Sequence, residues 1–197
     1  MKKISTYTII LTAIWVLLAA AVVNQQNLAE HIIRIHILAN SDSETDQAEK
    51  LEVRDAVLQV VSLRTAACSS RAEAAAVLRE SAAEIGAIAS EQCGKSVEVA
   101  LSPEWYDTRE YDAFSLPAGR YLSLQVKIGA AEGKNWWCVA FPAICTNALS
   151  TDLTTVAVSG GMGEEDLHMM TDDTADVKVR YYLLEKIYEI YHALTAD

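Results

Sequence analysis

Residues 116–145 read LPAGRYLSLQVKIGAAEGKNWWCVAFPAIC, and this is the most informative stretch of the chain. Pro117-Ala118-Gly119 opens it with a turn, because proline presets φ and glycine tolerates positive φ. From Leu122 to Ile128, apolar residues alternate with polar ones. This period of two predicts a strand with one buried face and one polar face. We expect a loop over residues 129–135, which contains two glycines.

The adjacent residues Trp136 and Trp137 follow, and we expect them in a polar-flanked loop. Neighbouring side chains point in different directions in a helix or a strand, so one core cannot easily bury both rings. The simpler interpretation is that one ring fills the core and the other covers loop backbone. The alternative is that one ring anchors a partner, since tryptophan is enriched at interface hot spots. Lys134 and Asn135 would then supply the polar rim.

The N-terminal segment indicates export. Lys2 and Lys3 precede an uncharged apolar run from Tyr7 to Val23. The run is at the lower limit for crossing a bilayer and long for the core of a signal peptide. We therefore predict that residues 1–26 are a signal peptide or a signal anchor, cleaved or uncleaved. Either alternative leaves the lysines inside and everything after Asn24 outside.

Length and charge bound the rest of the chain. The 197 residues, less the N-terminal segment, are enough for one small domain. The net charge of −11 argues against nucleic-acid binding, which needs a basic face. We predict an α+β fold, a single small domain with a mixed or antiparallel sheet packed by two or three helices. The expected parts are an α+β domain over residues 27–145, a flexible acidic loop over residues 146–176 and a C-terminal helix over residues 177–197.

Hydrophobic periodicity places the other elements. Residues 31–38, HIIRIHIL, indicate an interior strand, and a helix capped by Ser43 is expected from Ser43 to Leu63. A single helix fits Ser70–Gln92, followed by a strand through Val97, Val99 and Leu101. A third strand, over residues 105–114, would pair with residues 120–128 through the Pro117–Gly119 turn. The C-terminal helix has an apolar stripe of Val179, Leu183, Ile187, Ile190 and Leu194.

Two charged positions near the first helix are candidates for a site. Arg54 falls on the apolar half of that helix, so it needs a carboxylate partner or a route to solvent. Asp55 lies on another face, which makes it a poor intrahelical partner. Asp42, Glu44 and Asp46 have the spacing of a calcium loop, but Gln47 stands where that loop needs glycine. We therefore expect no metal site.

The four cysteines suggest disulfides in an exported domain. The favoured pair is Cys138–Cys145, which would close a tight loop. Cys68 and Cys93 stand at the two ends of one predicted helix, about 30 Å apart. Such a distance cannot be bridged, so we expect these two thiols to be free unless the helix is shorter.

Catalytic motifs are absent from the sequence. It has no Gly-x-Ser-x-Gly elbow, no His-Glu-x-x-His and no phosphate-binding loop. The four histidines are scattered singly. We predict no catalytic residues, no cofactor and no metal, and hence a protein that is not an enzyme.

Two segments carry a family resemblance. Residues 34–57, RIHILANSDSETDQAEKLEVRDAV, and residues 116–145 resemble the signature segments of stage II sporulation protein R. The matching patterns are ILANSDS before KLxVRD, then PAGxY and NWWCVxFPxxC. The resemblance covers most of residues 30–145 and is weak beyond Cys145. Ala130-Ala131-Glu132 stand where the family is expected to have a more glycine-rich loop.

The resemblance implies an intercellular signal of endospore formers. Such a protein is made in the forespore and exported into the space between the two septal membranes. There it triggers a membrane-embedded aspartic protease of the mother-cell side, which removes the pro-sequence of a sigma factor. The expectations drawn from the residues themselves agree with this implication on three points: export, a small α+β domain and the absence of catalytic motifs.

The leading hypothesis is therefore an exported, non-enzymatic ligand that activates a membrane protease. The candidate partner-binding residues are Asp42, Arg54, Asn135, Trp136 and Trp137. One alternative is an exported thiol-dependent hydrolase with Cys138 as the nucleophile. Another is a structural module associated with the cell wall or the membrane.

Overall fold

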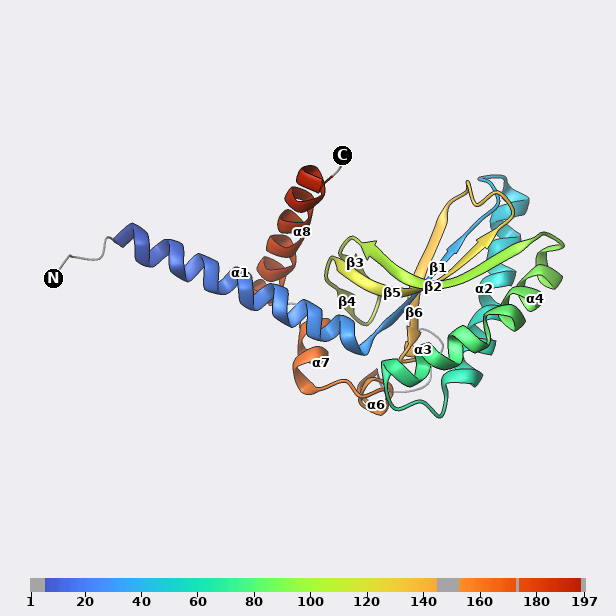
Figure 1. The fold of residues 1–197 in the computed structure, drawn as a ribbon, viewed down its shortest axis with the longest axis horizontal. Helices are drawn as coiled ribbons and strands as arrows, with labels where there is room; N and C mark the ends of the chain where they lie inside the picture. Colours follow the sequence, from blue (N-terminus) through green and yellow to red (C-terminus); the bar gives the residue numbers. More distant parts are fainter. Residues whose placement is uncertain (1–5, 145–152, 173, 196–197) are drawn as a thin grey trace. The chain divides into compact units, whose positions relative to one another are not determined.

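The computed structural model describes residues 6–144, 153–172 and 174–195 and confirms the α+β class. The chain divides into two compact units. One takes in residues 1–28, 105–120 and 164–197, and the other takes in residues 29–104 and 121–163. Figure 1 labels the elements of both units.

The larger unit is built on a four-stranded mixed sheet in the order β2-β5-β1-β6. Its strands are β1 (Ile33–Leu38), β2 (Val97–Tyr106), β5 (Gly119–Ile128) and β6 (Asn135–Phe141). β1 runs parallel to β5 and antiparallel to β6. Because β1 is paired on both sides, it is the interior strand that the sequence indicated, although it begins at Ile33 and not at His31. His31 is instead the last residue of the preceding helix.

The tryptophan pair lies in a strand and not in a loop. β6 begins at Asn135 and pairs with β1, with Trp136 opposite Ile37 and Trp137 opposite His36. The pairing with a buried neighbour overrides the polar flanks that suggested a loop. The alternation of a strand then puts the two rings on opposite faces of the sheet.

Helices cover one face of this sheet. α2 (Glu44–Thr65) contacts both β1 and β6, and α4 (Ala82–Cys93) lies beside α2 (Figure 1). The buried face of α2 is narrower than the expected apolar half. Val53, Val57 and Val61 are buried, whereas Leu51 is 43% exposed.

The predicted single helix over Ser70–Gln92 is divided in two. α3 (Arg71–Glu80) and α4 meet at Ser81, which both caps the C-terminus of α3 and accepts the first backbone hydrogen bond of α4 from Ile85. Gly94 ends α4 with φ +65°, a conformation that glycine adopts without strain. Cys68 and Cys93 are free thiols, as expected.

The smaller unit contains the N-terminal helix α1 (Thr6–His31) up to Leu28. Its length and composition suffice to cross a membrane. Tyr7 and Trp15 are well exposed, whereas Gln25 and Leu28 are buried. The apolar segment and the folded unit are thus joined by one uninterrupted helix.

The expected strand over residues 105–114 is much shorter. β3 (Arg109–Glu110) and β4 (Ser115–Leu116) form a small antiparallel hairpin, with Arg109 opposite Leu116. The Pro117–Gly119 turn therefore does not pair residues 105–114 with β5. The neighbours of β5 in the sheet are β2 and β1.

The stretch expected as a flexible acidic loop contains two helices, α6 (Leu153–Ser159) and α7 (Glu164–Thr171). Three acidic residues, Glu164, Glu165 and Asp166, occupy the first turn of α7. Negative charge is favourable there because of the helix dipole. Met169 and Met170 are buried and hold α7 in place.

The C-terminal helix α8 (Ala175–Thr195) buries a different stripe from the predicted one. Val177, Tyr181 and Leu184 are buried, whereas Val179 and Ile190 are 56% and 61% exposed. The hydroxyl of Tyr181 donates to backbone carbonyls of Ser115 and Met169. These hydrogen bonds select the face of α8 that packs.

Gly119 offers a test of how α1 packs in the smaller unit. A Cβ at this position would clash with the side chain of Gln25, a buried residue of α1. We expect Gly119→Ala to lower the free energy of unfolding by about 1–3 kcal/mol. Thermal unfolding of the full chain in detergent, followed by circular dichroism, measures the change.

Gly163→Ala is the matched control, because nothing lies within 4 Å of a Cβ built there. Adding Gln25→Ala to Gly119→Ala should restore part of the loss by making room. Equal effects of the two glycine substitutions would contradict the packing of Gln25 against Gly119.

Candidate functional site

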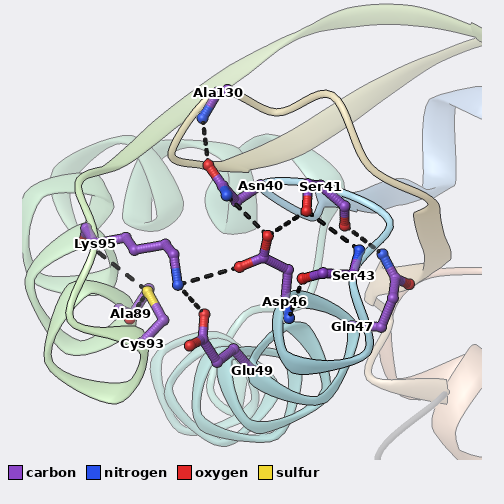
Figure 2. A network of polar contacts seen from close by, with 10 residues as sticks. All are labelled: Asn40, Ser41, Ser43, Asp46, Gln47, Glu49, Ala89, Cys93, Lys95 and Ala130. Atoms are coloured by element: carbon purple, nitrogen blue, oxygen red, sulfur yellow. Dashed lines mark hydrogen bonds and ion pairs between the residues drawn. The ribbon is translucent and has the colours of Figure 1, made fainter.

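The site begins where β1 ends and α2 starts. Ser43 caps α2, and its hydroxyl accepts a hydrogen bond of 3.1 Å from the backbone N–H of Asp46. The Asp46 carboxylate turns away from the cap and accepts hydrogen bonds from Asn40 Nδ2 at 2.8 Å and from the Ser41 hydroxyl (Figure 2). Ser43 thus caps α2 as predicted, while the Asp46 side chain is bound elsewhere.

Lys95 completes this network from the short connection between α4 and β2. Its ammonium group lies 3.2 Å from Asp46 Oδ1 and also pairs with Glu49 (Figure 2). Hydrogen bonds from Ser41 and Asn40, together with Lys95, hold the pKa of Asp46 well below its usual range. In turn, Glu49 and Asp46 raise the pKa of Lys95. Asp46 and its partners Asn40, Ser41, Glu49 and Lys95 form a charged cluster, which we call the Asp46 latch. It fixes the junction between β1 and α2 to the chain after α4.

The same junction holds the loop before β6. Asn40 accepts from the backbone N–H of Ala130 at 3.0 Å, and Asp42 Oδ1 accepts from that of Lys134 at 2.7 Å. Lys50 donates to the Lys134 carbonyl at 3.0 Å. Burial lowers the pKa of Lys50. Asp42, predicted as a partner-binding residue, thus has a contact that fixes the chain just before the tryptophans.

On the helix-covered face, Trp136 lies beside Arg54 of α2. The guanidinium carbon is 5.6 Å from the centre of the indole ring, within the range of a cation–π interaction. Arg54 Nε also donates to Asp55 Oδ1 at 2.7 Å, although the helical spacing argued against this partner. A side chain next in sequence can bend back along the helix surface, and the Arg54 side chain remains 27% exposed.

On the opposite face of β6, Trp137 and Asn135 gather around His36 of β1. The imidazole and Trp137 rings stack, with centroids 5.4 Å apart and an interplanar angle of 26°. His36 Nε2 lies 3.0 Å from Asn135 Oδ1, and Nδ1 lies 2.7 Å from Glu104 Oε1 of β2. The predicted residues therefore form two groups on the two faces of β6, and not one continuous surface.

Sequence reasoning missed His36 and Glu104 as members of the site. The period of two places Arg34 and His36 on one face of β1, which was the available signal for a polar cluster there. Glu104 carries no such signal, because 68 positions separate it from His36 along the chain. Only the sheet order brings the two residues together.

Cys138 lies in β6 and is 5% exposed. Its backbone carbonyl accepts a hydrogen bond of 3.2 Å from Arg34 Nε, and Arg34 is itself fully buried. Its predicted partner, Cys145, lies outside the described residues, so the Cys138–Cys145 disulfide stays a prediction. Within the described part of the chain, no three His, Cys, Asp or Glu side chains are grouped as metal ligands.

The latch predicts a pH dependence. Since the pKa of Asp46 is lower in the folded state, its charged form stabilises the fold above the ordinary aspartate value. This contribution is lost as the pH falls from about 4 towards the lower folded-state pKa. We expect Asp46→Asn to lower the unfolding temperature at pH 7, and the gap to the unmodified protein to shrink as the pH falls to 3.

Glu52→Gln is the control for this comparison, since Glu52 is an exposed acid of the same helix. Unfolding midpoints measured by circular dichroism across the pH range give the gap for each variant. A gap for Asp46→Asn that is constant with pH would contradict the latch.

The similarity to known proteins lies in the same part of the chain. The family model of stage II sporulation protein R matches residues 29–151. Stage II sporulation protein R of Bacillus subtilis (strain 168) is 37% identical over 123 residues, which cover 60% of this chain and 55% of the relative. The matched part thus spans about half the length of that relative. No solved structure matches.

The matched range contains every residue of the Asp46 latch and of the two tryptophan groups, and it leaves out most of α1 and all of α8. It takes in well over half of the chain. The chain belongs to the stage II sporulation protein R family.

Proposed function

We propose that this protein is an exported sporulation signal that binds and activates a membrane-embedded aspartic protease, without catalysis of its own. The observation that carries the proposal is the family match over residues 29–151. That range contains the two tryptophan groups on β6. The activated protease would then remove the pro-sequence of a mother-cell sigma factor.

The N-terminal helix supports the proposed location. Its exposed apolar part is compatible with a signal peptide or a membrane anchor. Export would bring the domain into the space between the forespore and mother-cell membranes. A protease embedded in the facing membrane would present its extracytoplasmic surface there.

The chemistry of the two groups supports binding. Tryptophan and arginine are the residue types most enriched at the energetic centres of interfaces. Trp136 and Trp137 are both half-buried, so each ring is held by its neighbours and still offers surface to a partner. A ligand of this kind activates only if it binds the active state of the protease more tightly than the inactive state.

The thiol-hydrolase alternative has less support. A nucleophilic cysteine acts as an accessible thiolate, usually beside a positive charge or a histidine. Cys138 is buried, and the contact with Arg34 is made by its carbonyl and not by its sulfur. Cys68 is a free thiol, but burial raises its pKa, which disfavours the thiolate.

A reconstitution tests the proposal. The full chain is coexpressed with the matching membrane protease and the pro-sigma factor in a non-sporulating host, and the precursor is followed by immunoblot. We expect cleavage that needs all three proteins and that is lost when residues 1–23 are deleted, because export is then blocked. Intact precursor, in a host where the protease is shown to be active, would contradict the proposal.

Substitutions on β6 test the surface. We expect Trp136→Ala to reduce precursor processing by roughly thirtyfold or more, as for a hot-spot residue worth at least 2 kcal/mol. Arg54→Ala, which removes the cation beside that ring, should reduce it in the same direction. Quantitative blots give the processing rates, and circular dichroism checks that each variant is folded.

Trp105→Ala is the matched control, because Trp105 is a partly exposed tryptophan that lies outside both groups. It should leave processing close to that of the unmodified protein. If Trp136→Ala and Trp137→Ala both unfold the domain, the two rings belong to the core and this surface is excluded as the binding site.

A further inference from the structure

We infer that His36 is a positioning residue for the partner-binding surface, and that it holds Trp137 and Asn135 in the orientation that a partner contacts. The inference rests on the proposed function and deepens it. It assigns a role to a buried residue that would not itself touch the partner. His36 is 7% exposed, whereas Asn135 is exposed and Trp137 is half-buried.

The geometry places His36 at the centre of three contacts. Its ring stacks on the Trp137 indole at a centroid distance of 5.4 Å. Nε2 is 3.0 Å from Asn135 Oδ1, and Nδ1 is 2.7 Å from Glu104 Oε1. Both nitrogens and one face of the ring are therefore engaged. A ring held in this way has little freedom to turn, and it transmits its orientation to its neighbours.

Glu104 fixes the orientation of the His36 ring. A carboxylate only accepts hydrogen bonds, so Nδ1 is the donor towards Glu104 Oε1. This contact sets the rotation of the ring and directs Nε2 towards Asn135. Glu104 belongs to β2, which β5 separates from β1, so the carboxylate reaches across a strand. Side chains of β1 and β2 thus position the exposed amide of Asn135 in β6.

The position of His36 does not require a histidine for packing. The apolar residues of β1, Ile33, Ile35 and Ile37, are fully buried and form the core on the other face. A polar group placed at a buried position costs free energy unless it is hydrogen-bonded. Here both bonds are made to side chains near the surface, at the start of β6 and in β2. The histidine therefore organises surface groups more than it fills the interior.

Two substitutions of His36 separate its contacts. His36→Phe keeps an aromatic ring for stacking but removes both hydrogen bonds, and His36→Gln keeps a polar end but removes the stacked ring. We expect each to reduce precursor processing in the reconstitution by at least about tenfold, because His36→Phe loses two hydrogen bonds and His36→Gln loses the stacked ring. Ser102→Ala is the control: it removes the 3.2 Å hydrogen bond from Gln125 to Ser102 and leaves the contacts of His36 intact.

Glu104 provides a second pair of variants for the case in which substitution of His36 prevents folding. Its side chain is 22% exposed, so its replacement disturbs the interior less. Glu104→Gln keeps an oxygen that accepts from Nδ1, and it should retain most of the processing. Glu104→Ala removes the acceptor and should behave like the His36 variants. Equal activity of the two Glu104 variants would overturn the positioning role.

A spectroscopic readout reports on the orientation of Trp137 directly. The near-ultraviolet circular dichroism is measured for the full chain in detergent. For the wild type and for each variant, the contribution of Trp137 is obtained by subtracting the spectrum of the same protein with Trp137→Phe added. We expect this contribution to be lost in His36→Gln and retained in Ser102→Ala. An unchanged contribution in His36→Gln overturns the inference, as does wild-type processing by a variant that has lost it. If the wild-type chain triggers no processing, the proposed function fails, and the spectra alone decide whether His36 positions Trp137.

Discussion

The arrangement of the larger unit depends on the carboxylate of Asp46. It accepts hydrogen bonds from Asn40 and Ser41, and it pairs with Lys95. These contacts close the corner between β1 and α2 and fasten it to the chain after α4. Since Asn40 and Asp42 at this corner also bind the backbone of the loop before β6, the position of that loop follows from the same corner. One buried charge, well compensated, thus sets the register of the strand that carries both tryptophans.

The second constraint is that β6 is an edge strand of a mixed sheet. Adjacent residues of a strand face opposite sides. Trp136 therefore meets Arg54 on the side of α2, while Trp137 meets His36 on the other side. A partner that contacts both rings would have to reach around this edge. In the proposed function, recognition would therefore depend on α2 and on β1 at once, which would link the surface to the integrity of the core.

The N-terminal helix joins an exposed apolar segment to the folded part of the smaller unit. α1 runs without interruption from its exposed apolar part to the buried residues Gln25 and Leu28. Gly119 leaves room for Gln25, so the Pro117–Gly119 turn packs against α1 at this residue. The exposed apolar segment and the part of the helix that packs in the smaller unit are therefore neighbours on one helix.

The sequence alone determined the apolar N-terminal segment, the α+β class, the strand over β5 and the start of α2 at Ser43, because local periodicity and capping encode these features. It also pointed to the segment around Trp136, and the quoted motifs pointed to the family. The tertiary structure decided what local patterns cannot encode. Pairing with β1 made β6 a strand, burial of Met169 and Met170 ordered α7, and hydrogen bonds of Tyr181 chose the buried face of α8 over the stripe from Val179. His36 and Glu104 meet only because β5 lies between their strands, and this sheet order arises from long-range contacts that no single segment specifies.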